Sequence, residues 1–121
     1  MRVTEREITA PVSLTTPDGR LNPAAFGWTR TPLHRTDGIG RGRYGWGRNK
    51  RWEYWAVTTP SHIVAFTVAD IDYAALHELW VFDRATGTET ARSALGVLGG
   101  SAQLPGTLGD GPVRGRKGDL A

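Results

Sequence analysis

Four short segments rich in aromatic and β-branched residues follow one another in the middle of the chain. Their composition is typical of β-strands, and we predict strands over residues 52–58, 62–69, 76–83 and 88–94. Only a few residues separate each segment from the next. Connections this short join antiparallel neighbours, because a parallel pair needs a long crossover. The sequence therefore predicts a mainly β fold built on an antiparallel meander.

A hairpin turn is predicted between the last two of these strands, at residues 83–87 (DRATG). Gly87 suits the turn position that requires a positive φ, because glycine adopts this conformation without steric cost. The hairpin predicts that residues 76–83 and 88–94 pair directly.

The predicted strands are apolar on both faces. The second strand alternates between Ile63, Ala65 and Ile71 on one side and Val64, Phe66 and Val68 on the other. An antiparallel sheet with one face in water alternates between apolar and polar side chains instead. We therefore expect cover on both faces, from the N-terminal arm, from closure of a barrel or from residues outside this chain. Unprotected strand edges also predict self-association.

The remaining sequence divides the chain into three parts. Residues 1–40 contain several prolines and Asp-Gly pairs, and they predict an irregular N-terminal arm with one helical turn capped by Asn22. Residues 41–95 form the predicted β core. Residues 96–121 contain eight glycines and few apolar side chains, which predicts a flexible tail that begins a missing C-terminal portion.

Composition limits the environment in which the protein works. The chain has no cysteine, which excludes disulfides and fits a reducing cytoplasm. Its first residues lack the apolar run of a secretory signal, and no window is apolar enough to span a membrane. The net charge of +3 comes mostly from arginine, and we interpret it as a consequence of a GC-rich genome instead of a nucleic-acid partner.

Three runs of residues are similar to a bacterial family called domain of unknown function 2804. They are residues 19–28 (GRLNPAAFGW, continuing through Arg30, Pro32, Leu33 and His34), 45–55 (GWGRNKRWEYW) and 69–73 (ADIDY). Residues 111–114 (GPVR) resemble a later segment of the family. The resemblance implies an antiparallel, lipocalin-like barrel, and because family members are longer it also implies that this chain is a truncated fragment. It implies no reaction.

Asp70 and Asp72 are the sharpest candidates for chemistry. If the second strand continues through them, both carboxylates lie on one face, about 7 Å apart. Carboxylates beside apolar surface acquire a raised pKa and serve as acids, and this separation suits an acid and a base on either side of a water. In the alternative interpretation the strand ends at Ala69 and both residues form a solvated turn.

Arg51, Trp52 and Tyr54 are the other candidate ligand-binding residues. Arg51 is predicted either to clamp an anionic group or to form an ion pair with Asp70 or Asp72, and we favour the ion pair. The aromatic residues suit a strand that lines an apolar cavity.

Other possible sites receive less support from the sequence. The three histidines are dispersed and have no metal-binding spacing, so we predict no metal and no cofactor. His34 is expected to be a hydrogen-bonded structural residue. The loop of residues 41–51 combines basic residues with Tyr44 and Trp46, a pattern that suits single-stranded nucleic acid. We favour a structural loop whose aromatic side chains pack under the sheet.

The favoured function is a β-barrel-like module that binds an apolar or amphiphilic small molecule. One alternative is an enzyme that uses Asp70 or Asp72 as acid or base on a hydrophobic substrate. Another is a weak nucleic-acid binder that uses residues 41–51. The residues leave open whether the chain is an enzyme.

Overall fold

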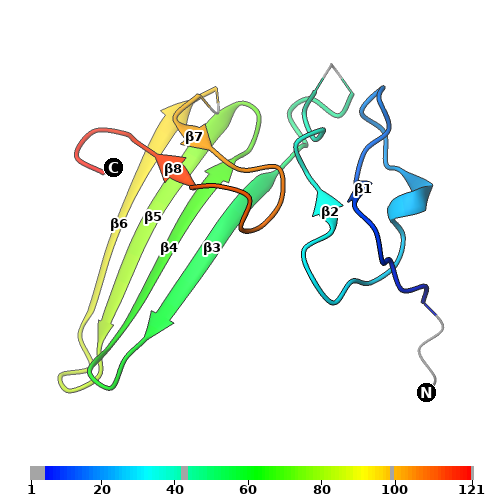
Figure 1. The fold of residues 1–121 in the computed structure, drawn as a ribbon. Helices are drawn as coiled ribbons and strands as arrows, with labels where there is room; N and C mark the ends of the chain where they lie inside the picture. Colours follow the sequence, from blue (N-terminus) through cyan, green and yellow to red (C-terminus); the bar gives the residue numbers. More distant parts are fainter. Residues whose placement is uncertain (1–4, 42–43, 99, 121) are drawn as a thin grey trace. The chain divides into compact units, whose positions relative to one another are not determined.

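A four-stranded antiparallel sheet dominates the computed structural model, which describes residues 5–41, 44–98 and 100–120 (Figure 1). Its strands are β3 (Arg51–Thr58), β4 (His62–Asp70), β5 (Ala74–Asp83) and β6 (Glu89–Val97). They pair in the order β3-β4-β5-β6. This arrangement confirms the predicted antiparallel meander. Within the described residues β3 and β6 each have one neighbour in this sheet, so the sheet is open.

The fourth strand is longer than local composition predicts. β6 continues to Val97, three residues beyond the predicted end at residue 94. The reason is its partner, because β5 begins at Ala74, and the pairs Ala74–Val97 and Ala75–Gly96 extend the ladder. Backbone pairing thus continues through a glycine that has low intrinsic strand propensity.

The hairpin between β5 and β6 forms as predicted. Gly87 has a φ of 70°, and its N–H donates to the Asp83 carbonyl at 2.9 Å. The Asp83 carboxylate accepts the backbone N–H groups of Ala85 at 2.8 Å and Thr86 at 3.2 Å. These hydrogen bonds lower the pKa of Asp83, because they stabilise the charged carboxylate.

The register of the sheet defines two faces, because paired residues in antiparallel strands project to the same side. We call one the Phe66 face, which carries the side chains of Trp55, Phe66, Val68, His77, Leu79 and Arg92. The other is the Trp80 face, which carries the side chains of Trp52, Tyr54, Leu76, Trp80, Phe82 and Leu95. Apolar side chains therefore occupy both faces, as the sequence pattern indicates.

The buried residues of the described chain are small. The buried hydrophobic set consists of Ile8, Ala25, Ala65, Ala69, Ala74 and Ala75. No large side chain among the described residues is fully buried. Trp52, Tyr54 and Leu95 on the Trp80 face are all more than half exposed. The sheet is thus held mainly by its ladder hydrogen bonds and by contacts along its surface, without a deep aromatic core.

Two further short strands, β7 (Ala102–Gln103) and β8 (Arg114–Gly115), form an antiparallel pair in the segment predicted to be a flexible tail (Figure 1). The segment lies on the Phe66 face. Gly115 approaches His77 of β5, and Asp119 forms an ion pair with Arg92 of β6 at 3.1 Å. Glycines permit this arrangement because backbone can approach the sheet where a side chain would clash.

The chain divides into two compact units, residues 50–104 with 113–121, described above, and residues 1–49 with 105–112. The second of these contains a parallel pair of short strands, β1 (Val12–Ser13) and β2 (His34–Arg35). It also contains one 3-10 turn, η1 (Pro23–Ala25).

The predicted helical turn and its cap are confirmed. The side chain of Asn22 accepts the backbone N–H of Ala24 at 3.0 Å, and proline occupies the first position of the turn. His34 lies 3.0 Å from the Ala25 carbonyl through Nε2, a hydrogen bond that agrees with its expected structural role. No helix in the described part of the chain is long and apolar enough to cross a membrane.

Candidate ligand-binding site

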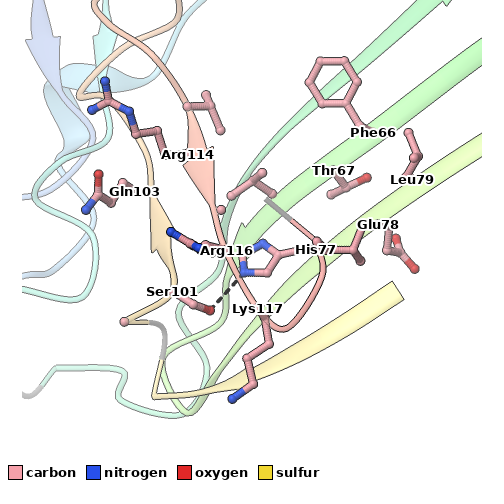
Figure 2. A pocket seen from close by; sticks show the side chains of 15 residues that line it. Phe66, Thr67, His77, Glu78, Leu79, Ser101, Gln103, Arg114, Arg116 and Lys117 are labelled. Atoms are coloured by element: carbon pink, nitrogen blue, oxygen red, sulfur yellow. Dashed lines mark hydrogen bonds between the residues drawn. The ribbon is translucent and has the colours of Figure 1, made fainter. Parts of the chain in front are cut away.

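A groove of about 910 Å³ lies on the Phe66 face, between the sheet and the segment that carries β7 and β8 (Figure 2). Side chains of β4 and β5 form its apolar floor, namely Phe66, Val68 and Leu79. The covering segment contributes Ser101, Gln103, Val113, Arg114, Arg116, Lys117 and Leu120. The groove is therefore apolar at its base, and its covering side is mostly polar or basic, with Val113 and Leu120 as apolar exceptions.

Phe66 and Leu79 occupy directly opposed positions on β4 and β5. Phe66 is 39 % exposed and Leu79 is 37 % exposed, although both lie in the central strands of the sheet. Central-strand residues of this size are usually covered, since burying either side chain is favourable by roughly 1.5–3 kcal/mol. The floor of the groove is thus apolar surface that a ligand would bury.

His77 anchors the covering segment to the sheet. Its side chain is only 5 % exposed, and its Nε2 atom lies 2.9 Å from the Ser101 hydroxyl (Figure 2). A side chain at Gly115 would clash with the imidazole ring, and a side chain at Gly96 would clash with the Ser101 hydroxyl. The two glycines therefore allow the pair to form directly under the covering backbone.

Burial lowers the pKa of His77, because the charged imidazolium loses solvation in this position. Its Nδ1 atom has no hydrogen-bond partner among the described residues. The neutral imidazole therefore suits this position, with one nitrogen bonded to Ser101 and the other beneath Gly115. A histidine and a serine at this distance resemble a base and a nucleophile, but the described residues supply no group to orient the imidazole through Nδ1.

Three basic residues border the groove along the covering segment: Arg114, Arg116 and Lys117 (Figure 2). All three are exposed. None of them forms an ion pair with another described residue. Nearby Asp119, by contrast, is already paired with Arg92. The rim of the groove thus carries positive charge that no described acidic side chain neutralises.

The two aspartates singled out in the sequence lie at the end of β4, outside the groove. Asp70 is the last residue of the strand, on the Phe66 face. Asp72 lies in the following turn with a φ of 65°, and its N–H donates to the Asp70 carboxylate at 2.9 Å. The strand therefore does not continue through both residues. The two carboxylates do not share a strand face, and Asp70 serves as an acceptor within the turn.

The other three candidate residues lie on different faces. Arg51 stands opposite Asp70 in the register of β3 and β4, and its Nη2 atom donates to the Leu104 carbonyl at 3.4 Å. Trp52 and Tyr54 project from the Trp80 face. Tyr54 borders a smaller hollow of about 390 Å³ there, but neither aromatic residue lines the larger groove. The structure thus does not bring the five predicted site residues together.

The basic loop is described only in part, because residues 42 and 43 lie outside the described chain. Tyr44 and Trp46 are 49 % and 64 % exposed, so neither packs into a core. The guanidinium of Arg20 lies 5.1 Å from the centre of the Tyr44 ring. Arg41 forms an ion pair with Asp37 at 3.1 Å, which neutralises one charge of the loop.

The described histidines and acidic residues form no group of three or more that could hold a metal ion. His62 lies beside Asp83 at 4.0 Å, near the hairpin. His77 bonds to Ser101 inside the groove. Each histidine thus serves a separate local contact.

Sequence analysis did not identify the residues that form the groove. One available signal was His77 itself, a polar residue flanked by apolar ones in a predicted strand. Another was the basic run at residues 114–117 (RGRK) within a glycine-rich segment that has few other charged residues. Neither signal shows that the two meet, because 36 residues separate His77 from position 113 and no local pattern connects them.

Comparison with known proteins adds one finding. The family model described as a domain of unknown function, DUF2804, matches residues 5–121. This match confirms the resemblance found in the residues themselves. No curated protein and no solved structure is significantly similar to the chain.

Proposed function

Because the chain belongs to the DUF2804 family, whose function is unknown, we propose a role from the groove itself: the protein binds an apolar or amphiphilic small molecule on its Phe66 face. The observation that carries this proposal is the apolar floor formed by Phe66, Val68 and Leu79, of which Phe66 and Leu79 are exposed. The volume of about 910 Å³ lies within the range of small-molecule sites, which extends from roughly 300 to 1,000 Å³.

The composition of the groove supports the same ligand class. Small-molecule sites combine a mostly apolar lining with a few placed polar groups. Here Phe66 and Leu79 supply apolar surface, and the covering segment supplies polar groups at Gln103 and Ser101. A purely polar ligand would leave the apolar floor exposed to water, whereas an alkyl chain or an apolar ring would bury it.

We also propose that the sheet is part of a lipocalin-like barrel. Both faces carry apolar side chains, and within the described residues β3 and β6 each lack a second neighbour. Pairing along these edges would close a wall around the Phe66 face. Hydrogen exchange tests this proposal: outward-facing amides of β3 and β6 that are as protected as those of β4 and β5 would support closure, and rapid exchange would contradict it.

Titration with dodecanol tests the binding proposal. Binding is followed by NMR through the methyl groups of Val68 and Leu79, and we expect saturable shifts at both. Leu79→Asp places a charge on the floor and should weaken binding at least tenfold. Leu95→Asp is the matched control, because Leu95 is an exposed leucine on the Trp80 face.

The control variant should bind as the unmodified chain does. The proposal is wrong if dodecanol produces no saturable shifts, or if Leu95→Asp reduces binding as much as Leu79→Asp. Far-UV circular dichroism of both variants shows that the sheet is retained before binding is compared.

A further inference from the structure

We propose that the ligand of this groove is a single-chain amphiphile with an anionic head, either a carboxylate or a phosphate, and that the positive charge of Arg114, Arg116 and Lys117 favours this head. This inference rests on the proposed function and specifies its ligand class. It follows from where positive charge lies relative to the apolar floor.

The unpaired charged side chains that border the groove are mostly positive. The three basic residues lie within four positions of the chain, and none is paired with a described acidic group. Asp119 is occupied by Arg92 at 3.1 Å. Glu78 also borders the groove, but the register places its side chain on the Trp80 face. An anion is therefore the species that complements this rim.

The position of the basic residues separates the two ends of the ligand. Gly115 approaches His77, so the extended backbone directs the neighbouring Arg114 and Arg116 away from the sheet. All three basic residues line the groove and are exposed, whereas Phe66 and Leu79 project from the sheet that forms its floor. A head close to the basic residues would leave the alkyl chain on the apolar floor.

The chemistry of the rim favours carboxylate or phosphate. Guanidinium groups donate parallel N–H bonds that match the paired oxygens of these anions, and lysine adds a point charge. Exposed ion pairs are individually weak, so three of them together supply moderate selectivity instead of very high affinity. We expect about a tenfold preference for an anionic head over a neutral one of the same chain length.

Four probes with the same alkyl chain test this inference: dodecanoate, dodecyl phosphate, dodecanol and dodecylamine. Isothermal titration calorimetry of the 121-residue chain, below the micelle concentration of each probe, gives the dissociation constants. We expect dodecanoate and dodecyl phosphate to bind about tenfold more tightly than dodecanol, and dodecylamine to bind most weakly. The preference should shrink as salt is added, because ions screen exposed charges.

A charge-matched pair of variants identifies the residues. The rim variant combines Arg114→Gln, Arg116→Gln and Lys117→Gln. The control variant combines Arg48→Gln, Lys50→Gln and Arg84→Gln, which are exposed residues that do not border the groove. Both variants lose the same net charge. The rim variant should lose the tenfold preference yet still bind dodecanol, and the control should retain the preference.

The outcomes separate this inference from the proposed function. If none of the four probes binds, the proposed function fails. If all four bind equally, or if the control variant loses the preference as the rim variant does, the anionic head is wrong while apolar binding stands. Binding to anionic vesicles without binding to monomeric dodecanoate would also overturn the inference, because the rim would then recognise a membrane surface.

Discussion

The Nε2 atom of His77 lies 2.9 Å from the Oγ atom of Ser101, a hydrogen bond that joins β5 to a segment 24 residues further along the chain. Together with the ion pair between Arg92 and Asp119, it fixes the covering segment on the Phe66 face. The groove exists only where this segment lies over the sheet. The groove therefore depends on a small number of contacts that variants can remove one at a time.

The close approach of Gly115 to the His77 ring gives a first prediction. Gly115→Ala should destabilise the chain by about 1–3 kcal/mol, because the new methyl group would overlap the imidazole ring. Gly100→Ala is the control, since a side chain there meets nothing closer than an ordinary contact. Urea unfolding measures both. Equal stability of the two variants would contradict the close approach of β8 to His77.

His77 also predicts a pH dependence of stability. Burial lowers its pKa below the unfolded value of about 6.5, so at intermediate pH the unfolded chain binds more protons than the folded chain. The stability that the neutral, buried His77 contributes should be fully present above the unfolded pKa. It should be lost as the pH falls through the lowered pKa of the folded chain.

His77→Gln should flatten the pH profile of the urea midpoint below the unfolded pKa of about 6.5. His62→Gln is the control, because His62 is a half-exposed residue at the start of β4, whereas His77 pairs with Val68 near the end of that strand. A profile that is already flat in the unmodified chain, or one that both variants flatten equally, would show that burial of His77 has no such effect.

The turn after β4 predicts a structural role for Asp70. Its carboxylate accepts the N–H of Asp72, whose φ is positive. Asp70→Ala should cost about 1 kcal/mol in urea unfolding, because this N–H loses its acceptor. Asp70→Asn keeps an oxygen in place and should cost less. If the asparagine variant is the less stable of the two, charge at Asp70 matters more than its acceptor geometry.

The exposed apolar surface predicts a chain of low stability that associates. The buried residues are mostly alanine, while Trp52 is 63 % exposed, so little of the aromatic surface contributes to burial. We expect a free energy of unfolding at or below about 5 kcal/mol, the lower end for folded domains. Light scattering should show association that rises with concentration.

Leu95→Lys, on the Trp80 face, should reduce this association. Leu21→Lys changes a leucine of similar exposure in the other unit and should have a smaller effect. A monomer with a sharp transition at high urea would contradict the prediction. Equal effects of the two variants would contradict the assignment of association to the Trp80 face.

Local patterns in the sequence predicted the sheet well. The alternation of Val64, Phe66 and Val68 with Ile63 and Ala65 indicated both faces of β4, and the register confirms it. The hairpin could be predicted because the conformation of Gly87 is a property of a few adjacent residues. Short connections then left only one antiparallel order for the four strands.

The site could not be predicted in the same way. The sequence pattern suggested Asp70 and Asp72 as a pair on one strand, but the strand ends between them because Asp72 adopts a positive φ. Trp52 and Tyr54 satisfied the expectation of an aromatic strand, yet the register turns them to the face opposite the groove. A shift of one residue would have exchanged the two faces, so side-chain type alone does not specify the lining.

What the residues specify locally is therefore the four strands, their turns and the apolar character of both faces. The tertiary structure decides which face becomes a groove, because that depends on where residues 100–104 and 113–120 lie against the sheet. Their return relies on Gly115 meeting His77 and on Ser101 bonding to it, contacts between residues far apart in the chain. Glycine allows this close approach because it has no side chain. For the same reason, a glycine in the sequence does not indicate which residue it will contact.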